Sequence, residues 1–417
     1  MLKQFFISSK NPERESYIWN LIGSTLNAFQ SVIMLVIITR VTSLNDAGIF
    51  SIAYANSVLL LNIGKYGMRN YQVSDYKSVF SFSEYKNSRI ITSLSMLIVS
   101  ALYVLIAAKI NDYSVNKSLI IFVMCIYKTI DALEDVYHGL YQKNNRLDIA
   151  GKAMSFRMAV TLIVFGASII ISKSLLVSLS LTTLISGLIC MYTIIITYDK
   201  FKQDKKASGD NITKLLKICF PLFLSLFLSF YINNAPKYAI DSLLNDELQA
   251  CYGFIVMPVF IIELLNGFIF NPIIYRLTNE WNTNKIKAFK KAIAKQTVII
   301  FLITALCEAA AYIAGIPVLS FLYNTDLSQY KSDLLILLLA GGGLALAGFF
   351  VTILTIMRKQ KFILFAYGFV AIAALILSGP VVKNYSITGA SFLYLFLMLL
   401  LSLFFIPAIL LFVHRQN

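Results

Sequence analysis

Long apolar stretches separated by short polar gaps recur along this chain of 417 residues. Because about 20 apolar residues in a helix cross the hydrocarbon core of a bilayer, such stretches predict membrane-spanning helices. We find twelve, at roughly 17–39, 48–63, 90–108, 118–141, 150–171, 175–198, 214–232, 248–275, 292–315, 333–357, 362–382 and 388–413. No gap is long enough for a soluble domain, so the pattern predicts an all-α integral membrane protein.

The composition agrees with this class. Hydrophobic residues make up 58% of the chain and charged residues 14%, against about 45–50% and about 25% in soluble proteins. The chain has five cysteines, which stand singly, without the paired spacing of a zinc site or a disulfide framework. We therefore expect no metal and no cofactor.

The distribution of positive charge orients the helices. Of the 36 Lys and Arg residues, 27 lie in the gaps on the side of the N-terminus and seven in the gaps on the other side, while Lys128 and Arg157 lie within spans. Because Lys-rich and Arg-rich loops stay in the cytoplasm, we expect both termini to be cytoplasmic. The net charge of +15 forms no basic stripe interleaved with aromatic residues, so nucleic acid is not an expected partner.

A repeated tripeptide points to an internal duplication. Leu44–Asp46 and Leu244–Asp246 have the same sequence, and they follow the first and the seventh span. With six spans of the same orientation in each half, this predicts two six-helix lobes around a central cavity, which is typical of transporters that open to each side in turn. We expect the lobes at 1–198 and 214–417, joined by a basic cytoplasmic linker at 199–213.

One predicted span carries most of the charge inside the membrane. Lys128, Asp131, Glu134, Asp135 and His138 fall within an arc of about 120° on the span at 118–141. Each charge near the bilayer centre costs about 2.5–3.5 kcal/mol, so this face needs ion-pair partners or water and cannot face lipid.

Arg157 on the next span lies at the depth of this polar face. We expect it to contact Asp131 or Asp135, either as a neutralised pair inside the lobe or as part of an open cavity. Five embedded acids against two embedded bases give the interior a charge of −3, which leaves room for coupling to H⁺ or Na⁺. The candidates for ion coupling are Asp131, Glu134, Asp135, Glu263 and Glu308.

Basic residues within the spans or at their ends are candidates for binding an anionic substrate. The same residues could instead anchor the helices by extending their charged ends to the membrane surface. The candidates are Arg40, Arg69, Lys128, Arg157, Lys237 and Arg276.

Two runs of sequence resemble a known family. Residues 19–76, which begin WNLIGSTLNAF, and residues 220–281, which begin FPLFLSLFLSF, resemble the starts of the two lobes of bacterial Wzx-type polysaccharide flippases. These belong to the multidrug/oligosaccharidyl-lipid/polysaccharide exporter superfamily. The resemblance implies alternating-access transport of an undecaprenyl-diphosphate-linked oligosaccharide to the outer leaflet of the bacterial inner membrane, driven by the membrane potential or by H⁺ or Na⁺. It also implies that Arg40, Arg69 and Arg157 hold the diphosphate. Membrane lipids, polysaccharide polymerase and export machinery would be further partners.

Two other classes of protein, an antiporter and an enzyme, compete with the flippase interpretation. A cation-coupled multidrug antiporter of the same superfamily is the alternative, and the acidic interior favours it. An enzyme is not expected, because the outer gaps are short and carry no cluster of Asp, Glu and His. ATP-driven transport is not expected either, because the chain has no phosphate-binding GxxxxGK[ST] sequence.

Overall fold

The computed structural model describes the whole chain except residues 1, 76, 202–207, 271–272 and 415–417. The described residues form helices joined by turns, with no β-strand among them. The chain divides into two compact units, Met1–Phe227 and Leu228–Asn417. An all-helical structure is what a lipid environment demands, because a helix satisfies its own backbone hydrogen bonds.

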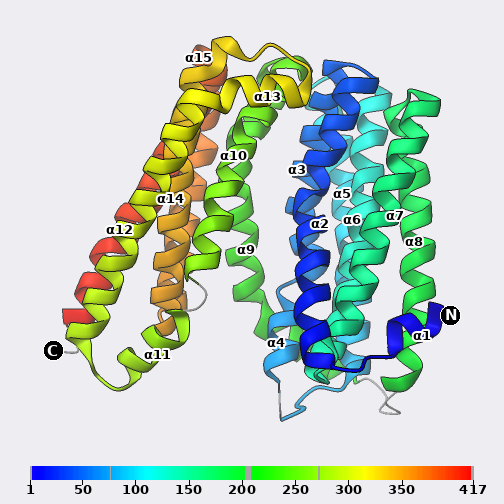
Figure 1. Ribbon diagram of the computed structural model, residues 1–417, viewed down its shortest axis with the longest axis vertical. Coiled ribbons are helices and arrows are strands. Elements are labelled where there is room, and N and C mark those ends of the chain that lie inside the picture. Colours follow the sequence, from blue (N-terminus) through cyan, green and yellow to red (C-terminus); the bar gives the residue numbers. More distant parts are fainter. Residues whose placement is uncertain (1, 76, 202–207, 271–272, 415–417) are drawn as a thin grey trace. The chain divides into compact units, whose positions relative to one another are not determined.

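Unit 1 is a bundle of long helices with short helices at one end (Figure 1). Within the bundle α2 and α7 run parallel, since Gly151 lies beside Trp19 and Gly166 lies beside Ile37. This agrees with the same orientation predicted for the first and the fifth span. The elements are α1 (Leu2–Ile7), α2 (Pro12–Val41), α3 (Leu44–Lys65), α4 (Met68–Ser74), α5 (Phe82–Ile110), α6 (Val115–Lys143), α7 (Leu147–Ser172), α8 (Leu175–Tyr198), η1 (Asp199–Phe201) and the first part of α9 (Gly209–Leu243).

Serine residues begin several helices of unit 1. Ser43, Ser81, Ser114 and Ser174 each accept a hydrogen bond from a backbone N–H in the first turn, at the starts of α3, α5, α6 and α8. These N–H groups have no partner within the helix, so the cap stabilises the start. At Ser81 the cap is reciprocal, because Glu84 accepts from the Ser81 N–H at 2.7 Å.

The break between α3 and α4 depends on a glycine. Tyr66 and Gly67 both have left-handed backbone conformations, with φ of 51° and 62°. A Cβ atom at Gly67 would lie 2.9 Å from Leu222 Cγ. Glycine is therefore required here both by the positive φ and by the close approach of α9.

Unit 2 contains α10 (Asp246–Phe270), α11 (Ile274–Asn282), α12 (Ile286–Ala310), the π-helical turn Ala311–Gly315, α13 (Ile316–Tyr323), η4 (Ser328–Tyr330), α14 (Lys331–Ile356) and α15 (Gln360–His414). α15 is interrupted at Ser386, with φ 51° and ψ −135°. The rings of Phe362 and Phe412 lie 6.2 Å apart and those of Phe369 and Phe404 lie 4.8 Å apart. α15 is therefore an antiparallel hairpin whose arms are the predicted spans 362–382 and 388–413.

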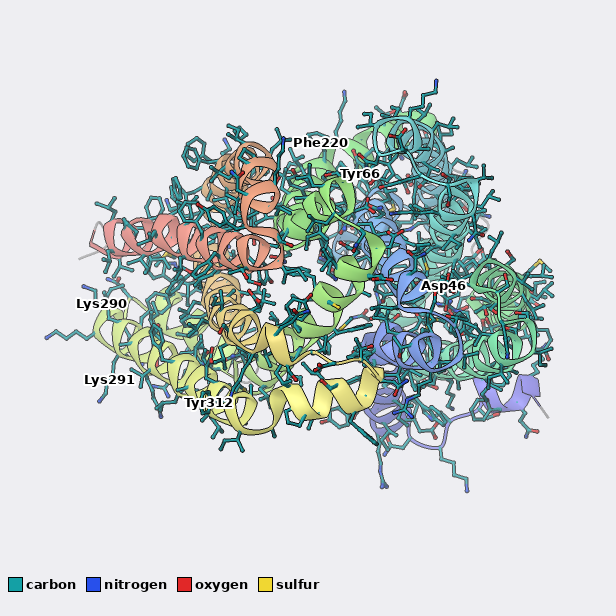
Figure 2. The ribbon with its side chains drawn as sticks, turned by 90° about the horizontal axis from the view of Figure 1, so that it is seen from above. Asp46, Tyr66, Phe220, Lys290, Lys291 and Tyr312 are labelled. Carbon is teal, nitrogen blue, oxygen red and sulfur yellow. The ribbon has the colours of Figure 1, made fainter. Side chains whose placement is uncertain are left out.

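The repeated tripeptide stands at a helix start in each unit, two residues further into the helix in unit 1 than in unit 2. In unit 1 Ser43 caps α3 by accepting from the Asp46 N–H, and in unit 2 Asn245 accepts from the Leu248 N–H at the start of α10. Figure 2 shows Asp46 in unit 1, and it shows Lys290 and Lys291 projecting outward from α12 in unit 2. Both lysines are exposed.

In the described part of the chain, nine helical segments are long and apolar enough to cross a membrane, and one of them contains the α15 hairpin. α6, which covers the predicted span 118–141, is not among them. A multi-pass membrane protein is thus confirmed, while the count of twelve spans and the cytoplasmic termini stay predictions. Residues 202–207 of the predicted linker lie outside the described part, and the lobe boundaries also stay predictions.

Two helices extend beyond the predicted spans in a way that matters for function. α5 begins at Phe82, before the predicted span at 90–108, and α9 ends at Leu243, beyond the predicted span at 214–232. As a result Arg89 and Lys237, which lie just outside the predicted spans, lie inside helices. The capped start at Ser81 explains the first difference, because a helix can extend beyond its apolar stretch when its end is capped.

Candidate functional site

α6 is the central helix of unit 1 and packs against α3, α5, α7 and α8. Its polar face points into the unit, as predicted. Lys128, Glu134, Asp135 and His138 are all buried, whereas Leu133 on the other face is 36% exposed. The helical period of 3.6 residues produces this division of polar and apolar side chains.

Arg157 on α7 joins the centre of this face. Its Nη2 lies 2.7 Å from Asp131 Oδ1 and 2.6 Å from Glu134 Oε2. Its Nε donates to Glu134 at 3.1 Å, and its Nη1 donates to Ser186 on α8 at 3.0 Å. The predicted contact with Asp131 is therefore present. With all three guanidinium nitrogens engaged inside unit 1, Arg157 ties α7 to α6 and α8.

Asp135 has a different partner from the one that we considered. Its carboxylate lies 2.8 Å from Arg89 Nη2, and Arg89 also donates to the Gly64 carbonyl oxygen at 2.6 Å. Arg69 lies 3.4 Å from Asp135 and donates to Gln142 at 2.9 Å. Arg89 is fully buried, and sequence reasoning missed it because the predicted span began one residue later. The pairing of Ser81 with Glu84, three residues apart, was the signal that could have found it.

Lys128 completes the cluster. Its Nζ donates to Asp131 and to Gln30 Oε1, both at 3.1 Å, and lies 4.8 Å from the centre of the Tyr54 ring. Gln30 on α2 is fully buried and also donates to the hydroxyl of Tyr127. A cation over an aromatic ring is stabilised further by the ring electrons.

These contacts correct the charge of the interior. Three bases, Lys128, Arg157 and Arg89, each lie within ion-pair distance of an acid on α6. We define these six residues, Arg89, Lys128, Asp131, Glu134, Asp135 and Arg157, as the α6 ion cluster. For this part of the interior the sequence predicted three acids and two bases, a charge of −1, and Arg89 makes the cluster electrically balanced. The total of −3, which also counts Glu263 and Glu308, stays a prediction.

Unit 2 contains a cavity of about 380 Å³ that holds a predicted cation. Lys237 lines it together with the amides of Asn233 and Asn234 on α9 and with Tyr367 and Tyr394 on α15. Within the described part of the chain, no hydrogen bond or ion pair engages the Lys237 ammonium. The described lining of the cavity therefore combines a positive charge that has no acidic partner within it with amide and phenol groups, which are donors suited to phosphate and sugar oxygens.

The remaining candidates lie elsewhere. Arg40 is exposed in the last turn of α2. Arg276 on α11 is largely exposed and pairs with Glu280 at 2.7 Å. Glu308 on α12 has one buried carboxylate oxygen, Oε1, without a partner among the described residues. The side chain of Glu263 lies outside the described part of the structure.

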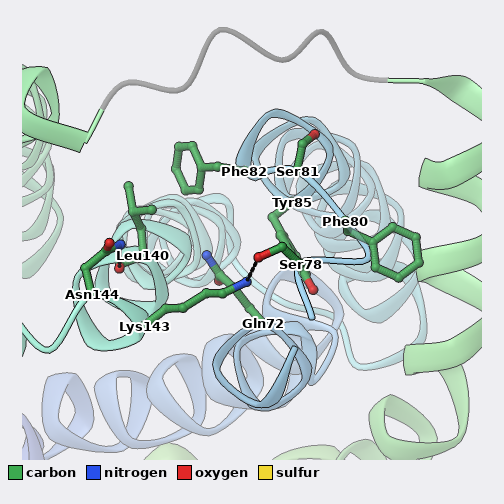
Figure 3. Close-up of a pocket in the computed structure, with 9 residues that line it drawn as sticks. All are labelled: Gln72, Ser78, Phe80, Ser81, Phe82, Tyr85, Leu140, Lys143 and Asn144. Carbon is green, nitrogen blue, oxygen red and sulfur yellow. Dashed lines mark hydrogen bonds between the residues drawn. The ribbon is translucent and has the colours of Figure 1, made fainter. Parts of the chain in front are cut away.

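A smaller cavity of about 190 Å³ opens at one end of unit 1, between α4, α5 and α6 (Figure 3). Lys143 donates across it to Ser78 at 3.3 Å, and Gln72 extends toward it from α4. None of the predicted site residues lines this cavity. We therefore do not assign it to transport.

Similar folds are found among membrane transporters. The inward closed form of the lipid II flippase MurJ has a TM-score of 0.73 at 13% identity, covering 95% of this chain and 90% of that one. An inward-facing multidrug resistance MATE family transporter of the MOP superfamily has a TM-score of 0.66 at 12% identity, covering 95% of this chain and 98% of that one. At such low identity these similarities establish the fold alone, which is that of a helical membrane transporter.

The sequence comparisons identify the family. A family model described as polysaccharide biosynthesis protein matches residues 14–274, and the chain belongs to this family. The capsular polysaccharide biosynthesis protein CapF of Staphylococcus aureus is 22% identical over 386 residues, which cover 90% of this chain and 94% of that protein. The resemblance to Wzx-type flippases is thereby confirmed. The family of this chain and the structural neighbours of the chain are transporters and flippases rather than enzymes, as the sequence predicted.

Proposed function

We propose that this protein is a flippase for undecaprenyl-diphosphate-linked oligosaccharide repeat units. It would move them from the inner to the outer leaflet of the bacterial inner membrane by alternating access of its two lobes. Family membership supports a role in polysaccharide biosynthesis, and the fold shared with a lipid II flippase supports a lipid-linked substrate.

The observation that carries the proposal is Lys237 in the cavity of unit 2, whose ammonium has no ion-pair partner among the side chains that the structure describes. A half-buried ammonium at this place favours an anion, and a diphosphate in the cavity would supply negative charge. A multidrug antiporter for organic cations needs the opposite, an acidic group without a basic partner. The acids of the α6 ion cluster do not meet this need, because each already has a base beside it. Glu308, outside the cluster, is the acid that the alternative antiporter would use.

The candidate residues then take different roles. We assign substrate binding to Lys237 first, and to Arg69, which keeps 30% of its side chain exposed. Arg157 and Lys128 would hold the helices of unit 1 in place, because their donors are used within it. Glu308 is the candidate for H⁺ or Na⁺ coupling, since one of its oxygens has no partner in the described chain.

The membrane potential supplies a sufficient driving force. A diphosphate with about two negative charges moves outward down an inside-negative potential, and each charge contributes about 2.3 kcal/mol per 100 mV. Coupling to H⁺ or Na⁺ through Glu308 would add to this force without being required.

The test is a translocation assay in proteoliposomes. A diphosphate-linked oligosaccharide is placed in the inner leaflet, and its arrival outside is followed by cleavage with an added glycosidase under an imposed potential. We expect Lys237→Ala to lose potential-dependent exposure and Lys237→Arg to keep part of it. Lys383→Ala, which removes an exposed lysine of unit 2 that does not line the cavity, should transport like the wild type.

Two outcomes would contradict the proposal. Wild-type transport by Lys237→Ala would remove the cavity from the mechanism. Absence of exposure with several glycans, combined with efflux of cationic dyes, would instead establish the antiporter.

A further inference from the structure

A groove on the surface of the unit 1 bundle lies between α5 and α8, with α6 at its base. Its volume is about 500 Å³. Ile90, Ile130, Leu133, Gly187 and Met191 line its apolar part, and all five belong to unit 1. Ile90 is 43% exposed and Met191 is 57% exposed, so the groove is open to its surroundings. In a membrane protein, the surroundings of such a groove are lipid acyl chains.

The length of the groove suits part of an acyl chain. Along α8 it runs from Gly187 to Ile195, which is about 12 Å at 1.5 Å per residue. A Cβ atom at Gly187 would meet Ile130 Cδ1 at 3.6 Å, which is ordinary contact. Packing therefore does not require glycine at this position, and the missing side chain leaves the groove open.

One end of the groove is basic. Lys86 and Arg89 line it from α5, three residues apart and so on the same face of the helix. No hydrogen bond or ion pair in the described chain engages the Lys86 ammonium. Arg89 uses its two Nη atoms for Asp135 and the Gly64 carbonyl, but its buried Nε has no acceptor among the described residues. Because Arg89 is fully buried, a ligand at this end of the apolar groove would be bound through the Lys86 ammonium.

We propose that this groove binds one anionic glycerophospholipid, distinct from the lipid that the protein carries. The phosphate would lie at Lys86, and one acyl chain would extend past Ile90 and Leu133 toward Gly187. Charge complementarity selects an anionic headgroup, because Lys86 has no acidic partner among the described residues. The bound lipid would also cover the Arg89–Asp135 ion pair of the α6 ion cluster.

Native mass spectrometry of the purified, delipidated full chain tests this proposal. Dioleoylphosphatidylglycerol and dioleoylphosphatidylcholine are added in parallel. We expect the wild type to retain one phosphatidylglycerol under conditions that remove phosphatidylcholine. Gly187→Leu fills the groove and should lose this lipid. Lys86→Ala should bind it about fivefold more weakly, the effect of one lysine at an anionic lipid surface.

Gly166→Leu is the matched control. Gly166 also has its nearest neighbour at 3.6 Å from an added Cβ atom, but it lies on α7 and does not line the groove. It should retain the lipid like the wild type, and size-exclusion chromatography should show all variants to be monodisperse. Retention of phosphatidylglycerol by a folded Gly187→Leu variant would overturn the proposal, as would equal retention of the two lipids. Displacement by an equal concentration of undecaprenyl phosphate would assign the groove to the carried lipid and overturn it too.

Discussion

Replacing Arg157 by methionine should destabilise unit 1 strongly. Asp131 would keep Lys128 at 3.1 Å, but Glu134 would lose both nitrogens that bind its Oε2. Glu134 is only 3% exposed, so its charge would remain buried with only the imidazole of His138, 3.5 Å from its Oε1, beside it in the described chain. Removal of one partner from a buried ion pair costs about 3–5 kcal/mol.

Thermal denaturation in detergent measures this effect, with the fraction of monodisperse protein followed by size-exclusion chromatography. Glu134→Gln, added to Arg157→Met, should restore much of the midpoint temperature, because it removes the unpaired charge. Arg69→Met is the control, and it should cost at most about 1 kcal/mol, since Arg69 is partly exposed and Asp135 keeps Arg89. Equal midpoints for Arg157→Met and Arg69→Met would refute the reasoning, as would a double variant less stable than Arg157→Met alone.

Two further predictions concern packing and pH. Gly342→Val should lower the midpoint temperature of thermal denaturation, because an added Cβ atom would lie 2.6 Å from Thr304 Oγ1. Such overpacking costs about 1–3 kcal/mol of stability. The control Gly368→Ala, with open space around the added Cβ atom, should not lower the midpoint temperature. Burial raises the pKa of the Asp75 carboxyl, but hydrogen bonds from two backbone N–H groups and the Tyr85 hydroxyl outweigh burial and hold this pKa below its usual value. Its stabilising contribution is therefore complete above about pH 4 and is lost as the pH falls through the lowered pKa. Asp75→Asn should be less stable than the wild type at pH 7, and thermal melts should converge toward pH 3; a constant difference would contradict this account.

The positions of the helices and the polar face of α6 could be read from the sequence. Both depend on local periodicity: apolar length marks a helix in lipid, and the 3.6-residue repeat places Lys128, Glu134 and Asp135 on one face. The Arg157–Asp131 contact was also predictable, because consecutive antiparallel helices bring residues at equal depth together.

The pairing of Asp135 with Arg89 and the isolation of Lys237 were not predictable in the same way. Hydropathy ends a helix where the apolar residues end, whereas α5 and α9 extend further into polar sequence. Whether an embedded charge has a partner depends on residues that are distant in the sequence, such as Arg89 and Asp135, which are 46 residues apart.

The sequence by itself determined a multi-pass helical membrane protein of a polysaccharide biosynthesis family, because hydropathy, periodicity and family motifs are properties of short segments of chain. Only the tertiary structure decided which charges are neutralised and which are available. It balanced the acidic face of α6 with Arg89, Lys128 and Arg157, and it placed Lys237 in a cavity where no described side chain forms an ion pair with it. The physical reason is that an ion pair is set by a distance of a few ångströms between side chains, and packing alone fixes that distance.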